Sequence, residues 1–182
     1  VNAMLVHLLN QQGKINLFDP VSHYIPEFAA NGKRRATIFH LLSHRGGIPN
    51  IETEVTPELL FDREQILKLL YAAKPISYSG NQLAYHAVTA GYILGELVER
   101  VTGQDIRQFL HENIENPMEM DFFNYGLKPE YRDQVATNYP TGMHPKLGTD
   151  LYLNRVLGGG LQLAVAVTND PRFMDTVCPA GN

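Results

Sequence analysis

The chain has 182 residues, of which 44% are hydrophobic and 19% are charged, and its formal net charge is −4. This size and apolar content are sufficient to bury the core of one globular domain. The fifteen basic residues are scattered, which argues against a nucleic-acid groove or a polybasic membrane surface. No apolar run approaches the roughly 20 residues that a membrane span requires. Small or neutral partners are therefore expected.

The single cysteine bears on the cellular compartment, and the two ends of the sequence bear on whether the domain is complete. Cys178 cannot form an internal disulfide, so cysteine usage indicates no particular compartment. Val1 stands in the middle of an amphipathic helical pattern with no capping residue before it, and residues 179–182 have the composition of a turn. We therefore expect residues 1–182 to be one incomplete domain.

The first 50 residues predict two helices separated by an extended stretch. Apolar residues repeat at helical spacing over residues 1–9, and Gly13 stands where a helix usually ends. Ile15 to Pro26 alternates turn residues with single apolar anchors, which predicts an extended surface segment. Thr37 can then cap a short helix that Gly46-Gly47 stops.

The clearest helical pattern lies in the middle of the chain. Thr56-Pro57 supplies a cap followed by proline at the first helical position, and apolar residues continue to Ala73 as one helix or two. Val88 to Thr102 then places its apolar residues on one face, and Gly103 closes the segment.

The last third is less regular. A further helical pattern runs from Ile106 to Ile114 and is stopped by Pro117. From Phe122 onward glycine, proline and asparagine are frequent, and only the region of Leu151 to Leu157 suggests another helix. About five helices with hardly any strand pattern predict a mostly helical domain.

The signatures of an activated serine are missing from the sequence. None of the four serines sits in Gly-x-Ser-x-Gly, and none has a lysine three residues later. No lysine begins a Lys-Ser/Thr-Gly strand either. The sequence therefore contains no recognisable nucleophile. The four residues are Ser22, Ser43, Ser77 and Ser79.

His40 and His44 are four residues apart on the short predicted helix and could share a face, as in a two-histidine metal clip. Position 41 is Leu where a zinc protease would have Glu, and no third ligand is placed, so we favour capping or packing and expect neither metal nor cofactor. The segment 43–47 could form an oxyanion loop of backbone N–H groups. A glycine-rich helix stop is the preferred interpretation.

Tyr85 and His86 stand just before the clearest helix, after a turn rich in Ser, Gly and Asn. A lone tyrosine in this position is more often a half-buried packing residue. A phenol at a helix entrance can alternatively act as a base toward a serine hydroxyl. Residue chemistry alone favours packing.

Four segments, taken in order, resemble the superfamily of serine beta-lactamases, DD-peptidases and family VIII esterases. The resemblance is to its esterase-like branch, which is related to class C beta-lactamases. Each motif alone is modest, but the order and spacing are specific. The segments are residues 1–21, residues 25–28, residues 37–48 with their Leu-Leu-Ser-His-Arg-Gly-Gly core, and residues 85–103, which open with Tyr-His-Ala.

The resemblance implies a parent fold of the α+β class, in which a helical domain packs on an antiparallel sheet. Residues 1–182 would supply most of the helical domain. They would lack the Ser-x-x-Lys segment that precedes residue 1 in the family and the Lys/His-x-Gly strand that follows residue 182. The implied activity is acyl transfer on a small ester or amide by a serine hydrolase. The alternatives are a non-catalytic scaffold or regulator with this fold and the zinc-dependent hydrolase considered above.

By the same resemblance Tyr85 corresponds to the tyrosine of the family's Tyr-x-Asn motif, the general base or proton relay, and His86 is a candidate substrate-binding residue. Tyr78 is a competing assignment, which we reject because only Tyr85 enters the following helix. Ala87 replaces the motif's Asn, which favours an ester over a beta-lactam substrate. Met118-Glu119-Met120 stands where many members have Leu-Gly-Met, a difference that says little about chemistry.

Overall fold

The computed structural model describes residues 1–141 and 161–175, apart from residues 52, 54 and 79. These residues form a helical body without a β-sheet, and the backbones of Pro20 and Thr37 make an isolated antiparallel bridge. No helix in the described part of the chain is both long enough and apolar enough to cross a membrane. The mostly helical architecture that the sequence predicts is confirmed.

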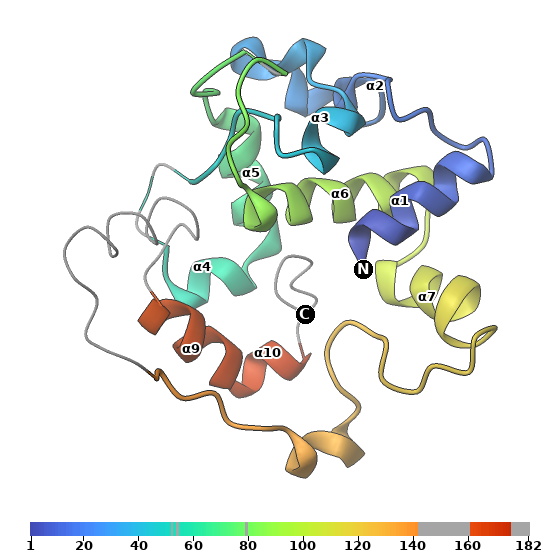
Figure 1. The fold of residues 1–182 in the computed structure, drawn as a ribbon, viewed down its shortest axis with the longest axis vertical. Coiled ribbons are helices and arrows are strands. Elements are labelled where there is room, and N and C mark those ends of the chain that lie inside the picture. The colour runs from blue at the N-terminus through green and yellow to red at the C-terminus, as the bar shows by residue number, and fades with distance from the viewer. Residues whose placement is uncertain (52, 54, 79, 142–160, 176–182) are drawn as a thin grey trace.

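Helix α6 (Ala87–Thr102) is the centre of this body (Figure 1). It contacts α1, α2, α3, α5 and α7, and nine of its sixteen residues are buried. The helix ends at Gly103, whose left-handed φ of 69° is readily adopted by glycine. The predicted helix from Val88 to Thr102 is therefore confirmed, with the start one residue earlier.

Helix α1 (Asn2–Gln11) lies beside α6, as the sequence predicts (Figure 1). Its apolar face buries Leu5, Val6 and Leu9 completely. At its first residue, the Asn2 side-chain amide donates a 2.8 Å hydrogen bond to the Gly91 carbonyl of α6. The two helices are thus joined by apolar packing and by one buried polar contact.

The expectation of an extended stretch from Ile15 to Pro26 is wrong in its second half. Helix α2 (Val21–Tyr24) forms there, and the 3₁₀ segment η1 (Pro26–Arg35) follows it. Val21, Ile25 and Phe28 are fully buried. Their spacing of four and then three residues is helical, and it prevails over the prolines because Pro20 and Pro26 stand just before or at the start of a helical turn.

Thr37 caps helix α3 (Ile38–Leu42), and its hydroxyl accepts a hydrogen bond from the His40 backbone N–H. The stretch after Thr56 forms two helices, α4 (Pro57–Phe61) and α5 (Arg63–Ala72). Asp62 separates them, and its carboxylate caps α5 by accepting from the Gln65 N–H at 3.0 Å. Thr56 caps α4 by accepting from the Leu59 N–H at 3.3 Å, so both predicted caps, Thr37 and Thr56, are confirmed.

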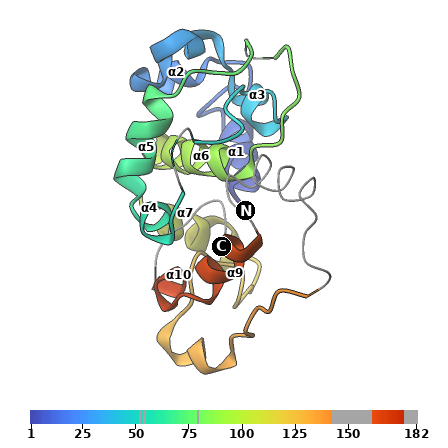
Figure 2. The ribbon, with the colours of Figure 1, turned by 90° about the vertical axis from the view of Figure 1, so that its left-hand side faces the viewer.

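The C-terminal third holds more helix than the sequence predicts. Helix α7 (Ile106–Leu110) continues into one π-helical turn, η2 (His111–Glu115). A 3₁₀ segment, η3 (Pro129–Gln134), and helices α9 (Leu161–Asn169) and α10 (Pro171–Asp175) follow. Figure 2 places α9 and α10 on the opposite side of α6 from α2 and α3. The possible helix at Leu151–Leu157 and the cysteine at position 178 fall outside the described residues.

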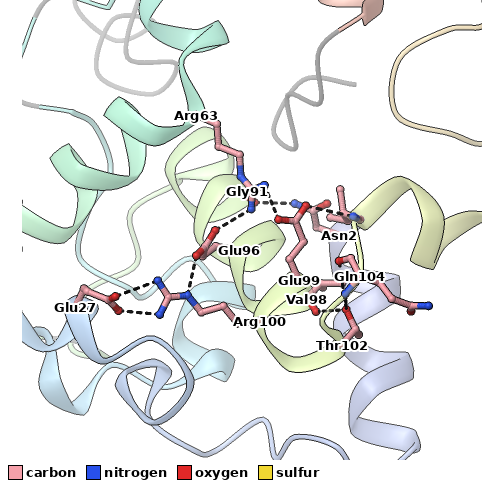
Figure 3. A network of polar contacts seen from close by, with 11 residues as sticks. Asn2, Glu27, Arg63, Gly91, Glu96, Val98, Glu99, Arg100, Thr102 and Gln104 are labelled. Atoms are coloured by element: carbon pink, nitrogen blue, oxygen red, sulfur yellow. Dashed lines mark hydrogen bonds and ion pairs between the residues drawn. The ribbon is translucent and has the colours of Figure 1, made fainter.

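Charged side chains tie α5 and η1 to the C-terminal half of α6 (Figure 3). Arg63 binds Glu96 at 2.8 Å and Glu99 at 2.5 Å, and Arg100 binds Glu96 at 2.7 Å. Arg100 also pairs with Glu27 of η1 at 2.9 Å through one nitrogen and at 3.1 Å through another. These partly exposed pairs form a network, so they fix the orientation of α6 better than isolated surface pairs would.

Lys33 closes the C-terminal end of α5 from inside the protein. Its side chain is fully buried, and its ammonium group donates to the carbonyls of Ala30, Tyr71 and Ala73 at 2.8, 3.0 and 2.5 Å. Burial holds the pKa of Lys33 below its usual value. Burying an ammonium group costs free energy, and the hydrogen bonds offset this cost. They also satisfy carbonyl groups that the end of a helix leaves without partners.

We expect the substitution Lys33→Met to lower the free energy of unfolding by about 2 to 4 kcal/mol, because it leaves these carbonyls unsatisfied. The matched control is Lys68→Met on an exposed face of α5, the helix whose end Lys33 closes, and this substitution should leave the stability essentially unchanged. Urea denaturation measures both. Equal stability of Lys33→Met and the wild-type protein would contradict the assigned role of Lys33.

Candidate active-site region

Two loops that are far apart in sequence pair through their backbones. The N–H groups of Ala84, Gly80 and Ile76 donate to the carbonyls of residues 44, 45 and 47, each at 2.9 Å. The Arg45 guanidinium adds a 3.0 Å hydrogen bond to the Gly80 carbonyl. This loop pair, residues 44–47 with residues 76–84, brings together the two motifs on which the family resemblance mainly depends.

The 44–47 loop is a helix stop, which is the interpretation we preferred from the sequence. Helix α3 ends at Leu42, and the chain turns through left-handed conformations at His44 (φ 57°) and Gly47 (φ 81°). A Cβ at Gly47 would come within 2.7 Å of the Ser77 carbonyl oxygen. Carbonyl groups of this loop are used in pairing with the second loop, so the loop is a structural connection.

Tyr85 stands at the entrance of α6, immediately before the N-cap residue His86. Its side chain is 50% exposed, and its ring centroid lies 4.7 Å from that of His44 with the planes tilted by 42°. No hydrogen bond to the Tyr85 hydroxyl occurs within the described residues. The phenol is therefore held by ring packing on one side while its hydroxyl is available to a partner.

His86 follows Tyr85 in the chain and is only 1% exposed. Its Nδ1 is 2.9 Å from the Ala84 carbonyl oxygen and 3.3 Å from Nδ1 of His44. The buried Nε2 has no hydrogen-bond partner among the residues described, and it faces Gly46. Burial is the main cause that holds the pKa of His86 below its usual value, and the nearby His44 acts in the same direction. His86 thus supports the site from within.

His40 and His44, which the sequence suggests as a metal clip, are engaged separately. His40 Nδ1 accepts from the Thr37 backbone N–H at 3.2 Å, and its Nε2 would lie 2.8 Å from a Cβ at Gly80. His44 Nδ1 faces His86. Within the described part of the chain, no cluster of three or more metal-ligating side chains occurs. The capping role that we preferred for His40 agrees with these contacts.

The other candidates from the sequence lie outside this arrangement. The Tyr78 side chain is 77% exposed in the turn that precedes Gly80. The hydroxyls of Ser22 and Ser43 donate to the backbone carbonyls of Arg34 and Phe39. Ser79 is not among the described residues. No serine that the structure describes is hydrogen-bonded to a lysine, histidine or tyrosine side chain.

One cavity of the described structure is not lined by Tyr85. This cavity of about 570 Å³ is formed by α7, the segment 124–129 and the end of α10, and its lining includes Arg107, Lys128 and Asp175. None of the residues that the sequence singles out lines it.

The loop pair and Tyr85 can be compared with known proteins. The sequence model of the beta-lactamase family matches residues 1–182. The chain belongs to the beta-lactamase family.

Its beta-lactamase relatives include esterases. Over 129 residues the chain is 33% identical to the "Esterase/beta-lactamase LipL" of Mycobacterium tuberculosis, covering 71% of this chain and 30% of that protein. A penicillin-binding protein homologue from Caulobacter crescentus has 34% identity and a TM-score of 0.72, over 78% of this chain and 38% of the other. A family VIII carboxylesterase has 27% identity and a TM-score of 0.75, and the match covers 100% of this chain and 48% of that protein.

The chain spans about a third of the length of the curated relatives it matches. The fold is beta-lactamase/transpeptidase-like, and the described residues are mostly helical. The family consists of serine hydrolases, including esterases and carboxypeptidases. The resemblance inferred from the sequence motifs is therefore confirmed.

Sequence reasoning missed the partner of Tyr85. His44 was considered as a metal ligand or as part of a helix stop, whereas its ring packs against Tyr85. A signal was available in its position just before Gly46-Gly47, because histidine is one of the residues that adopt a left-handed conformation at such turns.

We expect half-buried His40 and buried His86 to make stability depend on pH. The pKa of His40 is lowered by burial and by Arg45, and that of His86 is lowered mainly by burial. Below the unfolded-state histidine pKa of about 6.5 the unfolded chain therefore binds more protons than the folded chain. This contribution to stability is complete above about pH 6.5 and is lost as the pH falls below it.

We expect the midpoint of thermal unfolding to fall as the pH is lowered from about 7.5 to about 5, and His86→Gln to flatten this dependence. Scanning calorimetry across the range measures both slopes. His7→Gln is the matched control, because it removes an exposed imidazole from α1 and should leave the pH dependence of the unfolding midpoint unchanged. A slope that is the same in His86→Gln and in the wild-type protein would contradict the assignment.

Proposed function

We propose that the chain is part of a serine hydrolase that transfers acyl groups from small esters to water, with Tyr85 as the catalytic proton acceptor. One observation carries the proposal. The Tyr85 phenol is half exposed at the entrance of the most deeply packed helix, within the Tyr-His-Ala motif and against His44 of the family segment 37–48.

The proposed reaction uses a serine and a lysine from a part of the protein outside these residues. The serine hydroxyl gives its proton to the Tyr85 oxygen while the Tyr85 hydroxyl passes its own proton to the neutral amine of the lysine, and the serine oxygen attacks the ester carbonyl. When the bond between the carbonyl carbon and the alkoxy oxygen breaks, a proton returns from the lysine through Tyr85 to the leaving alcohol. Water repeats the sequence on the acyl-enzyme and releases the acid. Tyr85 is suited to this exchange because its hydroxyl has no competing hydrogen bond within the described residues.

An ester is preferred over a beta-lactam in this proposal because of Ala87. The methyl side chain of Ala87, at the first position of α6, replaces the asparagine amide that the family resemblance associates with lactam substrates. The names of the relatives support an esterase without excluding the lactam reaction for them, since one is called both esterase and beta-lactamase.

His86 has an indirect role in the proposal. A side chain that is 1% exposed has no surface to offer a substrate. Its contribution to substrate binding would come through the Ala84 carbonyl and His44, which it contacts at 2.9 and 3.3 Å and which adjoin Tyr85.

The 182-residue chain alone should hydrolyse neither p-nitrophenyl butyrate nor nitrocefin above background, because it contains no activated nucleophile.

In the full-length protein, Tyr85→Phe should lower kcat for the ester by about 10²- to 10⁴-fold with little change in KM. Steady-state kinetics on purified proteins measures this.

Tyr78→Phe is the matched control, since it removes the same hydroxyl from an exposed tyrosine seven residues earlier and should keep the activity. Full turnover in Tyr85→Phe would refute the proposed role of Tyr85. Turnover by the 182-residue chain that is abolished by Tyr85→Phe would refute the need for a serine from outside it.

A further inference from the structure

His44 contacts three consecutive residues around Tyr85. Its carbonyl oxygen accepts from the Ala84 N–H at 2.9 Å, and its ring centroid lies 4.7 Å from that of Tyr85. Its Nδ1 accepts from the His86 backbone N–H at 3.4 Å. One residue of the first loop thus binds the segment immediately before α6 through its main chain, its ring face and its ring nitrogen.

These contacts depend on an uncommon backbone conformation. His44 has a φ of 57°, in the left-handed region, where a side chain with a Cβ is less stable than in the right-handed region. The contacts with residues 84–86 offset this cost. Such a conformation in a residue other than glycine suggests that the side chain itself is required.

The hydrogen-bond pattern also defines the state of the two rings. Because His44 Nδ1 accepts from the His86 N–H, it carries no proton when this bond is formed. His86 Nδ1 can then donate to the Ala84 carbonyl at 2.9 Å, and it also faces His44 Nδ1 at 3.3 Å. A neutral His44 with its proton on Nε2 satisfies all of these contacts.

We propose that His44 is a positioning residue that sets the orientation of the Tyr85 phenol for proton transfer. This inference rests on the proposed function of Tyr85. The Tyr85 hydroxyl has no hydrogen bond within the described part of the chain, so packing must restrict the rotation of its exposed ring. The ring of His44 supplies that packing and is itself held by His86.

Two substitutions separate the ring from the backbone. His44→Gly keeps the left-handed conformation without strain but removes the ring. His44→Asn also tolerates this conformation and keeps a side-chain acceptor for the His86 N–H. In the full-length protein we expect His44→Gly to lower kcat by about 10- to 100-fold with KM within about threefold, because the proton acceptor is misplaced. His44→Asn should give an intermediate kcat.

A spectroscopic measurement tests the positioning without relying on turnover. In protein labelled with 3-fluorotyrosine, the Tyr85 fluorine resonance is identified by its loss in Tyr85→Phe. We expect this resonance to move in both His44 variants, because the neighbouring ring is removed, and to broaden most in His44→Gly.

His40→Ala is the matched control. This substitution removes the imidazole of His40, which lies in the same segment as His44. The imidazole packs on Gly80 and caps α3, but its ring does not pack on that of Tyr85. We expect this variant to be less stable but to retain kcat, once corrected for the folded fraction, and to keep the Tyr85 fluorine resonance in place.

Three results would overturn the inference. The first is a wild-type kcat in His44→Gly, or in His44→Asn if the glycine variant does not fold. The second is an unchanged Tyr85 resonance in the folded His44 variants, and the third is an equal loss of kcat in His40→Ala. If Tyr85→Phe keeps full turnover, the proposed function fails, and the fluorine resonance alone then decides whether His44 positions the ring.

Discussion

The pairing of residues 44–47 with residues 76–84 is the interaction on which the candidate site depends. It joins two segments that sequence separates by about 30 residues, and three backbone hydrogen bonds of 2.9 Å hold it in the absence of a sheet among the described residues. Gly47, which accepts one of these bonds, is buried, so that bond satisfies a carbonyl group that would otherwise be costly to bury. The close approach requires glycine at position 47, where a Cβ would lie 2.7 Å from the opposite carbonyl oxygen.

The loop pair can hold Tyr85 in place because α6 is itself held rigidly. Apolar packing on five other helices buries most of α6, and the Arg63 and Arg100 ion pairs fix its C-terminal half (Figure 3). The N-terminal end of α6 therefore enters the site from a fixed direction. The ion pairs lie at the C-terminal half of α6, whereas the contacts with Tyr85 lie at its N-terminal end.

Much of the fold could be predicted from the sequence because caps and apolar spacing are local signals. Thr37, Thr56 and Gly103 mark helix ends correctly. Helix α2 was missed because Pro20 and Pro26 were read as breakers, although Val21 and Ile25 already had helical spacing. The contact between His44 and Tyr85 was missed, because the sequence signals only the left-handed turn at His44 and not the pairing between distant loops that brings the two rings together. The motif order predicted the family, but not which side chains meet.

Amide hydrogen exchange at Ile76, Gly80 and Ala84 tests the loop pair most directly, since these N–H groups donate the three connecting hydrogen bonds. The loops have no other regular secondary structure to protect these amides. The account predicts that all three exchange much more slowly than the same residues in an unstructured chain. Exchange at the unstructured rate, in a protein whose α6 amides remain protected, would contradict it.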